Sequence, residues 1–323
     1  MTEQQSYSIE SYALFKNVDE TILKLNPIIK KKGYEFVSFN LSELEKNFSG
    51  LYSLPEKYDT SWFVVFDKGV TISNEFYQAY QNSSIGNTTS TNPKAFFLKR
   101  IKKFDRLTVN NTIELGKSMK VIEEMQKFRD ALIRKLKLFE NGNIMSPILF
   151  QVRSDSRKIE YQLMGRIMKP ITHKLYSIKD KDIIKLEKHL NQDLESTKLT
   201  ELAEMYFESS YELYDAKIRF TNLIIALESL FNCNKDKISH TIAKHLSIII
   251  SINKEEFERN YKRIKKLYRI RGQIVHGQTD RFKENIDNLT DEVQNLARTA
   301  ILYCIRTKMN KQELFLFLNS AGF

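Results

Sequence analysis

The segment YRIRGQIVHG, residues 268–277, places an arginine and a histidine five residues apart at the expected end of a helix. The imidazole of His276, with an ordinary pKa near 6.5, can accept or release a proton at neutral pH. The guanidinium of Arg271 stays charged and can bind two oxygens of one phosphate group. The pair is typical of a site that acts on phosphate esters, but two structural side chains at a helix end would give the same short pattern.

Other residues in the sequence do not indicate metal chemistry. Cys233 and Cys304 are the only cysteines, too few for a zinc site made of cysteine pairs, and we expect buried free thiols in a reducing compartment. His240 and His245 are five residues apart on one short predicted helix, so they do not share a face closely enough to bind one ion. We expect no metal and no cofactor.

The chain is strongly basic. A formal net charge of +11 and a pI near 9.3 indicate an anionic partner, with nucleic acid as the first candidate, although a solvated lysine-rich surface gives the same composition. Between residues 254 and 271, eight basic residues stand against three acidic ones. The tyrosines among them could stack on bases, but we favour inward packing of their rings. The candidate nucleic-acid-binding residues are Lys262, Arg263, Lys265, Lys266, Arg269 and Tyr268 in this segment, together with Asn222 earlier in the chain.

The N-terminal region, residues 1–195, has mixed α and β patterns. Two hairpins are predicted, at 62–73 and at 147–165 around a turn at 154–156, and a polar surface loop at 81–93. Helices are predicted at 113–139 and 180–194. The apolar stripe of the first comprises Val121, Met125, Phe128, Leu132 and Leu136. Because the first ten residues lack an apolar signal core and no apolar run approaches about 18 residues, we expect a soluble, cytoplasmic protein without membrane contact.

From about residue 196 the sequence is typical of helix throughout. Asn253, with Glu256 three residues later, predicts a helix start, and Gly277 suits the left-handed turn that ends this helix after about Val275. Another helix is expected to start at Thr290, and others are predicted within 212–231, 237–251 and 311–320. The broad apolar face of the first of these comprises Phe220, Leu223, Ile224, Leu227, Leu230 and Phe231.

Two separate blocks of this region resemble the HEPN superfamily of helical domains, and most of all its Apea-like branch. They are RFTNLIIALESLF at 219–231 and LYRIRGQIVHG at 267–277. The resemblance covers about residues 200–320 and leaves out the N-terminal region. It implies an all-α HEPN-type bundle at 196–323 after the mixed domain at 1–195. The expected fold class is therefore α+β.

The resemblance implies a metal-independent endoribonuclease that uses an R-x4-6-H motif, here Arg271 and His276. In such a reaction the ribose 2′-hydroxyl loses a proton as it attacks the adjacent phosphate, and the leaving 5′-oxygen gains one. The resemblance also places an acidic residue, Glu228, near the motif arginine, with Asn222 as a weaker companion. A structural salt bridge between Glu228 and Arg219 or a lysine is the alternative.

HEPN domains form two-fold dimers whose motifs face each other across the interface. A homodimer through the helical region would therefore bring a second Arg271 and His276 into one cleft. The resemblance also suggests a toxin-like role in bacterial stress or anti-phage defence. The N-terminal domain would then sense a trigger or regulatory partner, restrain the nuclease, or select the RNA.

The sequence departs from the family pattern after the motif arginine, where Gly272 stands in place of the usual polar residue. A glycine inside a helix indicates a kink or a close approach of another part of the backbone. Its presence also supports an alternative function, in which the helical domain is a non-catalytic module for dimerisation or nucleic-acid binding, or a scaffold subunit.

Overall fold

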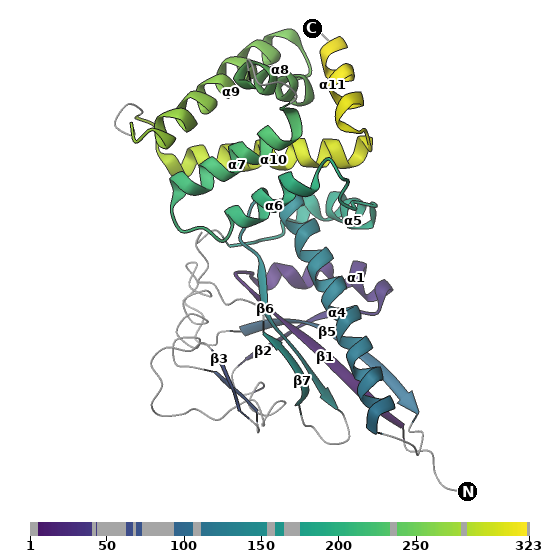
Figure 1. The fold of residues 1–323 in the computed structure, drawn as a ribbon. Helices are drawn as coiled ribbons and strands as arrows, with labels where there is room; N and C mark the ends of the chain where they lie inside the picture. Colours follow the sequence, from purple (N-terminus) through teal and green to yellow (C-terminus); the bar gives the residue numbers. More distant parts are fainter. Residues whose placement is uncertain are drawn as a thin grey trace, which may run out of the picture. The chain divides into compact units, whose positions relative to one another are not determined.

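The computed structural model describes residues 6–40, 43, 63–66, 69–72, 94–105, 111–153, 159–164, 175–232, 238–278 and 283–321 (Figure 1). The chain divides into two compact units. The N-terminal unit comprises residues 1–169 and 173–190, and the helical unit comprises residues 170–172 and 191–323. The expected loop at 81–93, the turn at 154–156 and Cys233 lie outside the described residues.

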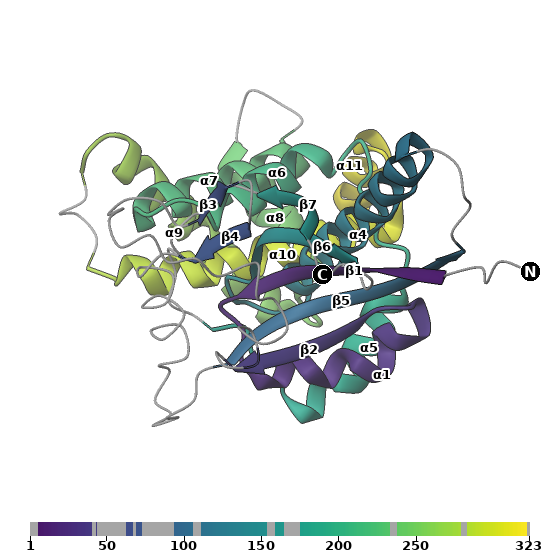
Figure 2. The same ribbon diagram turned by 90° about the horizontal axis from the view of Figure 1, so that it is seen from below.

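The N-terminal unit is built on an antiparallel sheet. Its strands are β1 (Ser6–Lys16), β2 (Glu35–Asn40), β5 (Lys94–Asp105), β6 (Met145–Arg153) and β7 (Ile159–Met164). Their order is β2-β5-β1-β6-β7, and Figure 2 shows β2, β5 and β1 side by side. β6 and β7 form the hairpin predicted at 147–165. β3 (Phe63–Phe66) and β4 (Gly69–Ile72) form the hairpin predicted at 62–73.

Four helical segments share one hydrophobic core with this sheet: η1 (Glu20–Leu25), α1 (Asn26–Ile29), α4 (Asn111–Phe139) and α5 (Ile183–Asn191). Two short 3-10 helices, η2 (Lys30–Lys32) and η3 (Asp180–Asp182), have no buried residue. The stripe predicted for α4 is confirmed: Met125, Leu132 and Leu136 belong to this core and the partly exposed Phe128 packs against it, while Val121 is buried in a smaller cluster with Tyr7 and Ile9. A buried hydrogen-bond chain adds to this contact: Ser118 of α4 donates to Gln151 of β6, and Gln151 donates to Ser11 of β1.

The helical unit contains no strand among its described residues. Its helices are α6 (Glu201–Ser210), α7 (Ala216–Phe231), α8 (Ile238–Ile250), α9 (Lys254–Val275), α10 (Ile286–Thr307) and α11 (Lys311–Ser320). α7 contacts each of the other five, and all six members of its predicted apolar face are buried. The chain is therefore of the α+β class. Across the described segments, no helix combines the length and hydrophobicity needed to cross a lipid bilayer.

Side-chain caps mark where α7, α9, α10 and α11 begin. The Asn253 side chain accepts a hydrogen bond from the Glu256 N–H at 2.9 Å, as predicted for the start of α9. The start predicted at Thr290 is wrong, because Asn285 caps α10 one turn earlier and accepts from the Asp287 and Asn288 N–H groups. Thr290 lies inside α10, where its hydroxyl lies 2.7 Å from the Ile286 carbonyl.

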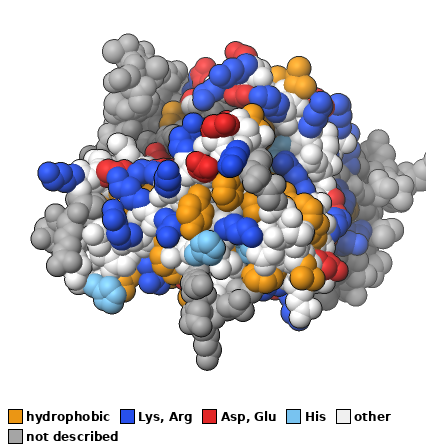
Figure 3. Space-filling model, turned by 90° about the horizontal axis from the view of Figure 1, so that it is seen from above, with side chains coloured by type: hydrophobic (Ala, Val, Ile, Leu, Met, Phe, Trp, Pro, Cys, Tyr) orange, Lys and Arg blue, Asp and Glu red, His pale blue; other side chains and the backbone are white. Residues whose placement is uncertain are grey.

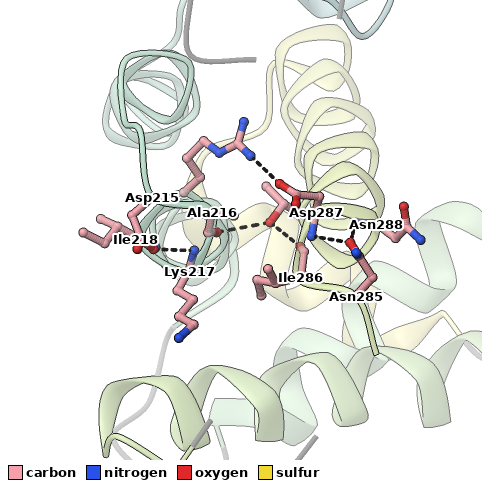
Figure 4. A network of polar contacts seen from close by, with 10 residues as sticks. Asp215, Ala216, Lys217, Ile218, Asn285, Ile286, Asp287 and Asn288 are labelled. Carbon is pink, nitrogen blue, oxygen red and sulfur yellow. Dashed lines mark hydrogen bonds and ion pairs between the residues drawn. The ribbon is translucent and has the colours of Figure 1, made fainter. Parts of the chain in front are cut away.

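Figure 4 shows the start of α10 beside the start of α7. Asp215 caps α7 by accepting hydrogen bonds from Lys217 N–H and Ile218 N–H. The Thr290 hydroxyl also lies 3.2 Å from the Ala216 carbonyl oxygen of α7. The two helix starts are therefore joined through the backbone of α7 as well as through apolar packing.

A buried histidine joins α8 to α11. His245 is 1% exposed and makes edge-to-face contacts with Phe231 and Phe315. Its Nε2 lies 3.1 Å from the Asn319 side-chain oxygen. Burial lowers the pKa of His245 below its usual value of 6.5, and the hydrogen bond to Asn319 only partly opposes this effect.

We therefore expect His245 to destabilise the fold in mild acid. Above about pH 6.5 the ring is neutral in both the folded and the unfolded chain, so it adds no pH dependence. As the pH falls below this value the unfolded chain binds a proton that the folded chain does not, and the free energy of unfolding decreases. Thermal unfolding measured between about pH 7.5 and about pH 5 should show a smaller decrease for His245→Gln than for wild type. His240→Gln, at an exposed histidine of α8, is the control; equal decreases in wild type and His245→Gln would contradict the expectation.

Candidate active site

The C-terminal end of α9 has a defined backbone geometry. The Gln278 N–H donates to the Gln273 carbonyl at 2.7 Å, and the Gly277 N–H donates to the Ile274 carbonyl at 3.1 Å. This pair of hydrogen bonds is the Schellman motif, and it requires the left-handed φ of 70° that Gly277 adopts. His276 is the last residue before this turn; its N–H donates to the Gly272 carbonyl and its side chain is exposed. The predicted helix end is confirmed.

Arg271 lies one turn earlier, with its side chain 28% exposed. Its Nη2 atom lies 3.9 Å from Oε1 of Glu228 on α7. Its Nε atom is buried and has no hydrogen-bond partner among the described residues. The guanidinium therefore faces one carboxylate through a long contact, its side chain is partly exposed, and its Nε is enclosed by the fold.

Glu228 has two partners on α9. Besides the ion pair with Arg271, its Oε1 accepts a 2.7 Å hydrogen bond from the Tyr268 hydroxyl. Arg219, the partner in the alternative structural reading, instead pairs with Asp287 at 3.0 Å. Burial, together with the bond to the Glu228 carboxylate, raises the pKa of Tyr268 to about 12, so its phenol keeps its proton at neutral pH.

His276 is set apart from this cluster. Five residues turn an α-helix by about 140°, so Arg271 and His276 do not project from the same side of α9. Among the described residues, no hydrogen bond or ion pair joins His276 to Arg271 or Glu228. A single chain thus presents the imidazole and the guanidinium as neighbouring but separate groups.

The candidate cations on α9 fall into two sets. Arg263 donates to Glu292 at 2.8 Å and pairs with Glu284 at 2.8 Å, and Lys266 pairs with Glu284 as well. The two cations hold the pKa of the Glu284 carboxyl down at about 2, and the two carboxylates raise the pKa of Arg263. This group, Arg263, Lys266, Glu284 and Glu292, is called the α9–α10 clamp below. Its cations are neutralised within the fold.

The other set faces solvent. Lys262 and Arg269 are exposed and have no ion-pair partner within the described segments. Lys265 is exposed and its Nζ lies 5.6 Å from the centre of the Tyr261 ring. These three side chains are available for a partner outside the chain.

Asn222 lies on α7 but contacts α6. Its side-chain amide donates to the Ser209 hydroxyl at 3.2 Å, and its side chain is half-buried. The structure therefore brings Glu228, Arg271 and Tyr268 together, while Asn222 bonds to a different helix.

Gly272 does not serve a close approach. A Cβ atom placed there would meet no heavy atom of another element within 4 Å, and α9 runs through the position without a break. The expected close backbone approach is wrong.

In the described segments, no three histidine, cysteine, aspartate or glutamate side chains lie together in a way that could hold an ion. Cys304 is buried, and burial raises the pKa of its thiol to about 12, which makes it unreactive. Neither a protein-family model nor a curated protein nor a solved structure matches this chain.

Two features of the site could not be predicted from patterns in the sequence. The Tyr268–Glu228 hydrogen bond joins residues 40 positions apart, and the clamp joins α9 to a segment that begins after residue 282. Spacing rules connect side chains on one helix, not on two. Inward packing of Tyr268 was expected, but its acceptor was not.

The two glycines at the end of α9 should respond in opposite ways to alanine. Gly272→Ala should raise the free energy of unfolding by about 0.5–1 kcal/mol, because alanine favours a helix interior and the position has space. Gly277→Ala should lower it by about 1 kcal/mol, because its φ is left-handed. Urea denaturation measures both changes. A loss of stability in Gly272→Ala would show that the position is constrained in a way that these contacts do not explain.

Proposed function

We propose that the helical unit is a metal-independent endoribonuclease of the HEPN type, with Arg271 and His276 as its catalytic residues. The observation that carries the proposal is the state of Arg271, whose side chain is 28% exposed and faces the Glu228 carboxylate at 3.9 Å. A partly exposed guanidinium, one turn from an exposed histidine at a helix end, suits the binding of a phosphodiester.

The proposed chemistry assigns one task to each side chain. His276 transfers a proton from the attacking 2′-hydroxyl or to the leaving 5′-oxygen. Arg271 binds the non-bridging phosphate oxygens and stabilises the charge that develops on them. Glu228 orients Arg271 and touches no substrate atom.

A homodimer completes this proposal, because one chain supplies one motif histidine while the reaction uses both a base and an acid. Exposed apolar side chains on the helical unit are available for such a contact. They are Leu202 and Met205 of α6, Ile218 of α7 and Val275 of α9. Val275 directly precedes His276, so a two-fold contact that includes Val275 would place two imidazoles close together.

The RNA strand would follow the exposed cations of α9 towards Arg271. Lys262, Lys265 and Arg269 are the residues available for this contact. In Figure 3, lysine and arginine side chains spread over the face shown, around a central group of hydrophobic side chains. This distribution suits an anionic partner.

The N-terminal unit is then the part that recognises a trigger, restrains the nuclease or selects the RNA, in a toxin-like response to stress or phage. The separate hydrophobic core of this unit supports a role of its own.

Purified protein should cut single-stranded RNA in EDTA and leave 2′,3′-cyclic phosphate and 5′-hydroxyl ends. Arg271→Ala and His276→Ala should each reduce cleavage by about 100-fold or more, because each removes a group that acts in the transition state. His240→Ala, at another exposed histidine of the helical unit, is the matched control and should cut normally. RNA binding without cleavage would instead favour the non-catalytic module, and cleavage that survives in both variants would exclude the proposed site.

The two sets of cations should differ in their effect on salt dependence. Lys262→Gln with Arg269→Gln should reduce the slope of log affinity for single-stranded RNA against log salt concentration by about 1.4, or about 0.7 for each lost phosphate contact. Arg263→Gln with Lys266→Gln removes the same charge but breaks the clamp. That pair should lower the melting temperature and change the slope little. Fluorescence anisotropy at several salt concentrations separates the two, and equal slopes for both pairs would contradict the division.

A further inference from the structure

Tyr268 and Arg271 meet on the same carboxylate oxygen. They are three residues apart on α9, and both reach Oε1 of Glu228, which lies 2.7 Å from the Tyr268 hydroxyl and 3.9 Å from Nη2 of Arg271. Residues three apart lie on neighbouring positions of a helix face, so one residue of α7 can contact both.

We propose that Tyr268 is a positioning residue for the Arg271 guanidinium, which acts by holding the Glu228 carboxylate in place. The inference rests on the proposed function for its effect on catalysis, but the positioning itself is a property of the free protein. It replaces the role of a base-stacking ring, which the sequence alone allowed for Tyr268.

The geometry assigns the fixing of the carboxylate to Tyr268 because the other contact is weak. At 3.9 Å the ion pair is longer than a hydrogen bond, so it does not by itself fix the orientation of the Glu228 carboxylate. The Tyr268 hydroxyl, in contrast, makes a short hydrogen bond to a charged acceptor, which is among the stronger neutral–ion contacts in proteins. Once its carboxylate is fixed, Glu228 determines the position at which the Arg271 guanidinium has its most favourable electrostatic energy.

The phenol can serve as donor throughout the working range of an imidazole. Burial and the Glu228 carboxylate keep the proton on Tyr268 up to about pH 12. Tyr268 therefore does not itself act as an acid or base near neutral pH, and its loss should not change the shape of a pH–rate profile.

The chain offers a matched control in Tyr261, seven residues earlier on α9. It is half-buried like Tyr268, but its hydroxyl lies 2.6 Å from Nδ1 of His240 on α8 and makes no contact with Glu228. Changing either tyrosine to phenylalanine removes one hydroxyl from the same helix and preserves the ring.

The test is RNA cleavage by Tyr268→Phe, Tyr261→Phe and Tyr268→Leu, measured as kcat and KM over a pH series with melting temperatures alongside. Tyr268→Phe should lower kcat about ten-fold, with KM nearly unchanged and the pH profile of unchanged shape, whereas Tyr261→Phe should match wild type. In a Glu228→Ala background, Tyr268→Phe should cause no further loss, because the two residues act in series. If Tyr268→Phe cuts normally and Tyr268→Leu raises KM, the ring stacks on RNA and the positioning role is wrong.

A second readout does not require cleavage. In the free protein, the Nε–Hε signal of Arg271 in ¹H–¹⁵N NMR should be sharp in wild type and in Tyr261→Phe, and broadened in Tyr268→Phe. Glu228→Gln keeps an acceptor for the phenol but removes the charge that attracts Arg271. If Glu228 links Tyr268 to Arg271, this variant should also broaden the signal. It provides a test that does not depend on Tyr268→Phe being folded. An unchanged signal in a folded Tyr268→Phe or Glu228→Gln variant would overturn the positioning role. If the wild-type protein cuts no RNA but the variants show the expected signals, the nuclease proposal is wrong and the positioning role is still supported.

Discussion

Glu228 brings a negative charge into the half-buried contact between α7 and α9, and a partly desolvated carboxylate is unfavourable unless it is paired. α9 meets this requirement with one neutral donor, Tyr268, and one cation, Arg271. The need to compensate one carboxylate therefore determines the orientation of the residue that would bind phosphate. It also explains why Arg271 is incompletely satisfied, since the better hydrogen bond to Glu228 is made by the tyrosine.

The other helices of the helical unit hold α7 and α9 in the positions that let Glu228 contact Tyr268 and Arg271. α7 is surrounded by the other helices, so Glu228 occupies a fixed position near its C-terminal end. The α9–α10 clamp fixes the middle of α9, and the turn at Gly277 fixes its end. A clamp of four charges is more specific than an apolar contact, because each charge must find its partner.

Local signals allowed the sequence to predict much of this arrangement. Asn253 and Gly277 correctly predicted where α9 begins and ends, because a cap acts on the backbone of residues close to it in sequence. The start of α10 was predicted wrongly because Thr290 and Asn285 are both residues that can cap a helix. The hydrogen bonds that Asn285 accepts show that it is the cap. Which cations of α9 are free was beyond prediction, since Glu284 and Glu292 reach them through the fold and not through spacing.

The central claim is that Arg271 and His276 promote attack by a ribose 2′-hydroxyl on the adjacent phosphate. The most direct measurement is cleavage of an RNA that carries a single 2′-deoxynucleotide on the 5′ side of the bond the protein cuts. The account predicts that this bond becomes resistant, while other susceptible bonds in the same molecule are cut at their usual rate. Cleavage at the substituted bond would mean that water or another nucleophile attacks the phosphate, and would contradict the roles given to both side chains.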